Sequence, residues 1–149
     1  MIKKMKAAIL VNTNKPLVID QVMMPTKLKL GQVLVKNIYS GICGSQVGEI
    51  KASKGPDKYL PHLLGHEAVG KVIKTGIGVS KVKENDKVIL HWMKSYGLDA
   101  EVPLYSWKNK KLNSGKITTF SEYTICPENR LTKIPKNLSA LDAVMFGCA

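Results

Sequence analysis

Arginine is nearly absent from this sequence, although the chain is strongly basic. Arg130 is the only arginine, while the formal net charge is +12. The lysines attract phosphate groups, but the arginine forks that commonly read base edges are missing. The lysines are also scattered from Lys3 to Lys136 without a long run. We therefore expect a solvated lysine-rich surface and no nucleic-acid partner.

Long apolar runs are lacking as well. No stretch approaches the roughly 18 residues that a membrane-spanning helix needs. The basic start and the apolar run 7–11 have some likeness to a signal peptide. That run ends at Asn12 without a small-residue cleavage site, so it is better interpreted as a strand. We expect a cytoplasmic protein with no membrane partner.

Cysteine is scarce, with only Cys43, Cys126 and Cys148. An odd number of widely spaced cysteines argues against a disulfide scaffold and for a reducing compartment. In that setting a cysteine is more often buried, catalytic or bound to a metal.

Short apolar and β-branched runs, separated by turn residues, predict a mainly β fold. The expected strands cover 5–11, 17–22, 33–39, 68–74, 87–91, 120–126 and 131–134. Many short strands at this spacing are typical of a small barrel or sandwich. The length of 149 residues is that of one domain.

Three segments depart from the strand pattern. A short helix is expected over 44–50, and another over 140–146, where Ser139 is a plausible N-cap with Asp142 three residues later. The segment 92–116 has no clear period, and a loop of this length in a compact domain is usually functional or mobile.

Cys43, His66 and Cys148 together offer the sulfur and nitrogen ligands that zinc prefers. Their wide separation is unlike a zinc finger and suits a site assembled by the fold, with one coordination position left open. Each residue alone has an ordinary interpretation. A lone cysteine is usually a small buried side chain, and a lone histidine is usually a surface or hydrogen-bonded core residue.

Several ordered segments carry a resemblance to a known family. Gly-Ile-Cys-Gly-Ser at 41–45 and Gly-His-Glu at 65–67, followed by Ala-Val-Gly-Lys-Val, resemble the two signature segments of the zinc-containing medium-chain alcohol dehydrogenases. The segments 75–79 and 85–88 resemble the loop and strand that follow. Phe-Gly-Cys-Ala at 146–149 resembles the family's third ligand segment. Agreement of several segments in order is far more specific than any single motif.

The resemblance implies a GroES-like β-barrel over residues 1–149, acting as a zinc-binding catalytic domain. In it, Cys43, His66 and Cys148 would hold one catalytic zinc. The reaction implied is oxidation of an alcohol, or reduction of a carbonyl, with a nicotinamide cofactor. A zinc ion lowers the pKa of a bound alcohol, which eases loss of its proton.

Three further residues receive roles from the resemblance. Ser45 would relay the substrate proton, Glu67 would approach the metal during ligand exchange, and Trp92 would line the substrate pocket. The alternatives are that Ser45 caps the following helix, that Glu67 is only a structural hydrogen-bond partner, and that Trp92 belongs to the core.

The sequence departs from the family pattern near the metal ligands. Gln46 stands where the family usually has an aspartate that orients the zinc-binding histidine, so we expect Gln46 to contact the non-metal nitrogen of His66. The alternative is that Gln46 points to solvent and that another group or water contacts His66. Gly48 stands where some members have a proton-relay histidine. The segment 92–116 lacks the four cysteines of the family's structural zinc, so that zinc is expected to be absent.

A further difference concerns the cofactor. The sequence holds no Gly-x-Gly-x-x-Gly segment after a strand, so the fingerprint of a nucleotide-binding Rossmann domain is missing. We therefore expect a catalytic-domain fragment that is inactive alone. The complete enzyme would use NAD or NADP, act on a small alcohol or carbonyl compound, and form a homo-oligomer.

Two other functions share features with this sequence. A GroES-like barrel also serves co-chaperonins, which bind a partner through a mobile loop and need no metal, and 92–116 is a candidate for such a loop. Cysteine and histidine at positions 43, 66 and 148 have no use there. The second rival, a zinc-free reductase, lacks this ligand set and is disfavoured.

Overall fold

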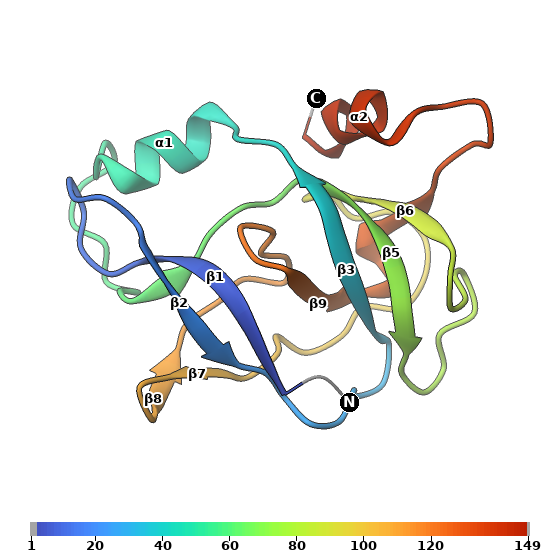
Figure 1. Cartoon of the computed structure of the whole chain (residues 1–149), viewed down its shortest axis with the longest axis horizontal. Coiled ribbons are helices and arrows are strands. Elements are labelled where there is room, and N and C mark those ends of the chain that lie inside the picture. The colour runs from blue at the N-terminus through green and yellow to red at the C-terminus, as the bar shows by residue number, and fades with distance from the viewer. Residues whose placement is uncertain (1–2, 149) are drawn as a thin grey trace.

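Short antiparallel strands make up most of the computed structural model, which describes residues 3–148 (Figure 1). The strands are β1 (Lys4–Leu10), β2 (Val18–Met23), β3 (Gln32–Ser40), β4 (His62–Leu63), β5 (Ala68–Thr75), β6 (Lys87–Leu90), β7 (Tyr105–Trp107), β8 (Lys110–Leu112), β9 (Tyr123–Pro127) and β10 (Leu131–Lys133). One sheet has the order β4-β1-β2-β7-β8 and the other β10-β6-β5-β3-β9. The predicted mainly β barrel with short helices is confirmed.

The two sheets join through the residues just before β9. Ala8 N–H donates to the carbonyl of Phe120 at 2.8 Å, and Glu122 N–H donates to the carbonyl of Lys6 at 3.0 Å. The predicted strand 120–126 is therefore wrong at its start, because residues 120–122 bond to β1 before the chain turns to pair with β3 from Tyr123 onward. This switch between sheets helps to close the barrel.

Strand β3 lies between two apolar clusters. Leu34 packs with Met5 and Ile9 in one cluster, while Val33 and Val35 point into the other. Both faces of this half of the strand are therefore buried. Each such side chain contributes roughly 1.5–3 kcal/mol through burial, which fixes β3 as the central support of the site that follows it.

Both α-helices lie along the same edge of the barrel, at the top of Figure 1. They are α1 (Gly44–Ile50) and α2 (Ala140–Ala143), and α2 continues as the 3₁₀ turn η2 (Val144–Gly147). The Ser139 hydroxyl accepts from Asp142 N–H at 3.1 Å, which confirms the predicted cap. The α-helix predicted to reach 146 ends earlier, where Ala143 and Val144 pack on β5 and β6. Within residues 3–148, no helix has the length and apolar character needed to cross a membrane.

The segment 92–116 is more ordered than its sequence predicts. It contains the hairpin β7–β8, whose two-residue turn places Lys108 and Asn109 at φ values of 49° and 61°. Such positive φ values are typical of the type I′ turn that matches strand twist. The hairpin extends the first sheet beyond β2. Tyr105 also accepts Ile125 N–H through its hydroxyl at 3.2 Å, so this segment is anchored to the barrel.

Candidate metal centre and adjoining pocket

Cys43 is placed by the turn between β3 and α1. The N–H of Gly41 and the hydroxyl of Ser40 both donate to the carbonyl of Glu67, each at 3.1 Å. These bonds hold the end of β3 against the segment that precedes β5. Cys43 then occupies the N-cap position of α1 with an extended backbone (φ −84°, ψ 151°). Its sulfur therefore lies beside the His66–Glu67 pair.

His66 and Glu67 follow a tightly packed glycine. Gly65 has a φ of +90°, and a Cβ at this position would lie 2.4 Å from Thr119 Oγ1 and 2.6 Å from Phe120 Cδ1. Only glycine can adopt this left-handed backbone conformation and also fit in the space available. The chain thereby enters β5 with His66 and Glu67 next to Cys43.

Cys148 is brought in from the far end of the sequence by a close backbone approach. A Cβ on Gly147 would lie 2.5 Å from the Cβ of Glu67 and 2.7 Å from the carbonyl oxygen of Leu90. Trp92 N–H donates to the carbonyl of Gly147 at 3.3 Å. The last turn is therefore pressed against β6 and the Glu67 backbone, and the next side chain is that of Cys148.

The predicted ligands meet at one point. One ligand atom from each of Cys43, His66, Glu67 and Cys148 lies within 4.8 Å of the others. The two sulfurs are 3.5 Å apart. The buried Nε2 of His66 has no hydrogen-bond partner among residues 3–148. An orphaned imidazole nitrogen beside two sulfurs and a carboxylate fits a zinc ion, which accepts all of these donors.

The two thiols differ in acidity. Hydrogen bonds from the hydroxyl and the backbone N–H of Ser45, and then from Cys148, hold the pKa of Cys43 below its usual value. The hydrogen bond to Cys43, followed by burial, raises the pKa of Cys148. Cys43 is therefore the sulfur that carries negative charge more readily, and Cys148 is the one that keeps its proton. A thiolate is the form that binds a metal.

Gln46 lies beside the Nδ1 atom of His66. Its side-chain Nε2 is 2.6 Å from His66 Nδ1, and the residue is only 3% exposed. The Oε1 atom of the same amide is buried and without a hydrogen-bond partner within the described residues. A half-turn of the Gln46 amide group would exchange its nitrogen and oxygen, so that the oxygen accepts Nδ1–H of His66. Nε2 of His66 would then have a free lone pair.

A large pocket adjoins the cluster. It has a volume of about 950 Å³ and lies between α1, the segment after it, the residues around His66, and residues 113–118. Ser45 and Gly48 both line it. Trp92 is not among the lining residues and is 49% exposed, so the core alternative for Trp92 is wrong. Its role in a substrate pocket stays a prediction.

The pocket also contains a carboxylate–imidazole pair that the sequence did not predict. Asp57 and His62 both line the pocket, with 2.7 Å between Asp57 Oδ2 and His62 Nε2. The two residues lie on either side of the turn that leads into β4, and no spacing rule for catalytic or metal sites singles them out. Asp57 and His62 come together only because the chain turns back along the pocket wall.

The chain is similar to a known protein family and to several alcohol dehydrogenases. The model of the alcohol dehydrogenase GroES-like domain family matches residues 29–136. Alcohol dehydrogenases of Geobacillus stearothermophilus and Moraxella sp. (strain TAE123) are 32% and 30% identical, each over 97% of this chain and 44% of the relative's length. An NAD-dependent alcohol dehydrogenase of Sulfolobus acidocaldarius is 31% identical with the same coverage.

Solved structures agree on the fold. An alcohol dehydrogenase zinc-binding domain protein from Burkholderia ambifaria superposes with a TM-score of 0.83 at 20% identity, covering 98% of this chain and 46% of that one. Benzyl alcohol dehydrogenase from Acinetobacter calcoaceticus gives 0.77 at 21% identity, covering 95% and 44%. The chain thus spans less than half the length of the relatives it matches. The chain belongs to the alcohol dehydrogenase GroES-like domain family.

Proposed function

We propose that this chain provides the zinc-binding catalytic domain of a nicotinamide-dependent alcohol dehydrogenase, which oxidises an alcohol or reduces a carbonyl compound. The observation that carries the proposal is the convergence of Cys43, His66, Glu67 and Cys148, with ligand atoms within 4.8 Å of one another. The orphaned Nε2 of His66 supports it, because a buried nitrogen without a partner is costly unless it binds something.

One catalytic zinc would be held by Cys43, His66 and Cys148, and when bound it supplies the Lewis acidity that lowers the pKa of a substrate alcohol. Ser45 would take a substrate proton and pass it outward, and its position in the pocket lining beside Cys43 supports this role. Glu67 lies within the same cluster and offers an alternative carboxylate ligand. Gln46 fixes the His66 ring.

The segment 92–116 contains no cysteine, so we assign the domain one zinc and no structural zinc. The same segment bears on the rival function. A co-chaperonin presents a mobile loop to its partner, whereas here β7 and β8 pair with each other and β7 pairs with β2. The metal-free binding module is therefore the weaker candidate.

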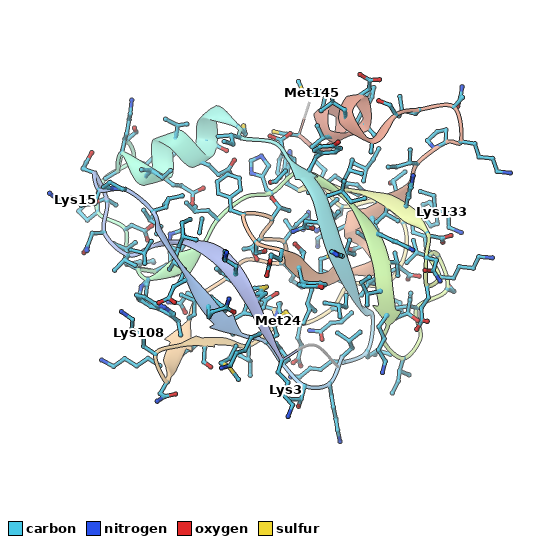
Figure 2. All side chains as sticks on the ribbon, viewed as in Figure 1. Lys3, Lys15, Met24, Lys108, Lys133 and Met145 are labelled. Carbon is cyan, nitrogen blue, oxygen red and sulfur yellow. The ribbon has the colours of Figure 1, made fainter. Side chains whose placement is uncertain are left out.

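The hydride acceptor would be NAD or NADP, bound by a domain that resides outside these 149 residues, and the chain alone would be inactive. The name of the Sulfolobus relative supports a nicotinamide cofactor. We expect a homo-oligomer in the cytoplasm, acting on a small alcohol or carbonyl substrate. Nucleic acid is not an expected partner, because Lys3, Lys15, Lys108 and Lys133 lie at separate edges of the molecule (Figure 2).

Metal analysis tests the proposal directly. The purified chain should contain about one equivalent of zinc, and cobalt substitution should produce the intense absorption bands of a thiolate-bound tetrahedral metal. Calorimetry should detect no NAD or NADP binding to the chain alone. A folded chain that refuses both zinc and cobalt would refute the proposal.

A further inference from the structure

Apolar atoms make up most of the surface of the pocket beside the proposed metal centre, although many of its lining residues are polar. More than half of its lining residues have polar or charged side chains, and only a few are aliphatic. Its volume of about 950 Å³ also far exceeds what a small alkanol fills. Ligand pockets are generally lined mostly by apolar side chains, with a few polar groups that fix orientation. The polar groups in this lining would therefore fix the orientation of a ligand that can form hydrogen bonds with them.

Asp57 is the most constrained of these groups. One carboxylate oxygen accepts Tyr59 N–H at 2.8 Å, and the other lies 2.7 Å from His62 Nε2. Burial opposes ionisation, but the hydrogen bonds from Tyr59 and His62 outweigh it and hold the pKa of Asp57 below its usual value. A carboxylate has about four acceptor positions, of which two are used here. Its side chain is 15% exposed and is among those that line the pocket.

His62 keeps this carboxylate in place. Its Nδ1 faces the carbonyl of Leu63 at 3.0 Å, while its Nε2 faces Asp57. Both neighbours of the ring are oxygen atoms, and an N–H at Nε2 would donate to the Asp57 carboxylate. Contacts with Tyr59 N–H and His62 therefore hold the Asp57 carboxylate in one orientation.

Asn113 adds a second acceptor to the same pocket. Its Nδ2 donates to the carbonyl of Tyr59 at 2.7 Å, which fixes the orientation of the amide. Within residues 3–148, the amide oxygen of Asn113 accepts no hydrogen bond. Asp57 and Asn113 both contact the Tyr59 backbone, so their acceptors belong to one section of the pocket wall.

We propose that the wall formed by Asp57, His62 and Asn113 selects a polyhydroxylated substrate, a polyol or its carbonyl form, over a simple alkanol. This proposal rests on the proposed function and specifies its substrate class. An alkyl chain against this wall would strip water from the Asp57 carboxylate and return no hydrogen bond. A site built to bond a substrate hydroxyl rejects the analogue that lacks it, because buried polar groups are then left unpaired.

The test compares two ligands of equal carbon number, xylitol and 1-pentanol, added to the zinc-loaded chain and followed by protein NMR. Xylitol should shift the amide signals of residues around Asp57 and Asn113 and should bind at least about tenfold more tightly than 1-pentanol. The variant Asp57→Asn keeps the shape and one acceptor but loses the charge, and it should reduce this preference about tenfold.

The matched control is Asp20→Asn. Asp20 also accepts a ring N–H, from Trp107 Nε1 at 2.8 Å, and a backbone N–H, from Gln21 at 2.7 Å, but it does not line the pocket. The Asp20 variant should keep the full preference for xylitol. Absence of a preference for xylitol, whether both ligands bind or neither does, would overturn the proposal, as would an unchanged preference in Asp57→Asn.

Zinc content is measured in the same samples. A chain that binds no zinc but still prefers xylitol would refute the proposed function while supporting the assignment of the pocket wall. A chain that binds zinc but shows no preference for xylitol would overturn the substrate class and leave the metal centre standing.

Discussion

The side-chain amide of Gln46 lies 2.6 Å from Nδ1 of His66, on the side of the ring away from the unpaired Nε2. A metal at Nε2 requires the ring proton on Nδ1, so the group facing Nδ1 has to accept it. The amide oxygen of Gln46 can do so, but it carries no charge. The His66 ring is therefore a weaker donor to zinc than one supported by a carboxylate.

Gln46→Glu should tighten zinc binding. Glutamate has the same length as glutamine, so its carboxylate can occupy the position that faces Nδ1 and accept the proton as an ion. Partners of this kind change metal affinity by about 10–100-fold. Competition against a chelator of known affinity measures the change.

Gln46→Met serves as the control for packing, because it keeps a similar volume at this buried position but cannot accept a proton from His66. It should weaken zinc binding relative to the unmodified chain. Equal affinities for the glutamate, methionine and unmodified proteins would mean that Gln46 has no influence on the metal.

Cys43→Ser and Cys148→Ser should each reduce the zinc content from about one equivalent to near zero, since each removes a sulfur ligand from a site that has few. Cys126→Ala is the matched control. Burial raises the pKa of Cys126 to about 12, and its side chain packs in the core. Loss of zinc from Cys126→Ala in a folded protein would contradict the ligand assignment.

Gly147→Ala should both destabilise the chain and weaken its metal centre. The new methyl group would meet Glu67 at 2.5 Å and the carbonyl of Leu90 at 2.7 Å, so η2 must shift and Cys148 must move with it. Overpacking of this kind costs about 1–3 kcal/mol. Gly115→Ala, where the nearest atom is 3.5 Å away, should change neither unfolding midpoint nor zinc affinity.

Acid should destabilise the fold through His91. Burial lowers the pKa of His91 from its usual 6.5, although hydrogen bonds to backbone carbonyls partly oppose this effect. The unfolded chain therefore binds the proton more readily, and stability is full above about pH 6.5 and declines as the pH falls below it. Urea unfolding at several pH values should give a flatter profile for His91→Gln. Identical slopes for the two proteins would contradict this role.

Glu128→Gln should destabilise the barrel by about 2 kcal/mol, the scale of hydrogen bonds to a charged acceptor. Glu128 is 1% exposed, and its carboxylate accepts the N–H groups of Ser80, Lys81 and Leu98. Glu122→Gln is the comparison, because it changes an exposed carboxylate that accepts only Lys6 N–H among residues 3–148. Urea unfolding should show a clearly larger loss of stability for Glu128→Gln than for Glu122→Gln.

The strands were predictable from local apolar patterns, and the grouping of Cys43, His66 and Cys148 was predictable from the family resemblance. Apolar and β-branched runs located β1, β3 and β5 to within a few residues. The ligand segments were identifiable because glycines flank them, and two of these glycines, Gly65 and Gly147, are required by contacts closer than 3 Å. A resemblance built on such segments identifies positions where the backbone itself is constrained.

The remaining features depend on contacts between distant segments. The turn of β7–β8 uses Lys108 and Asn109 at positive φ, and only Asn109 is a residue that favours that region. The pocket wall joins Asp57, His62 and Asn113, which meet only after β4 has paired with β1. Neither arrangement follows from spacing in the sequence.

The cluster of Cys43, His66 and Cys148 also links segments that are far apart in the sequence. A metal bound there would tie residues 105 positions apart, much as a disulfide would, and would remove a large loop entropy from the unfolded chain. The last turn has to dock on β6 before the third ligand is in place. Metal uptake in a refolding experiment should consequently lag behind formation of the barrel and mark the final step of assembly.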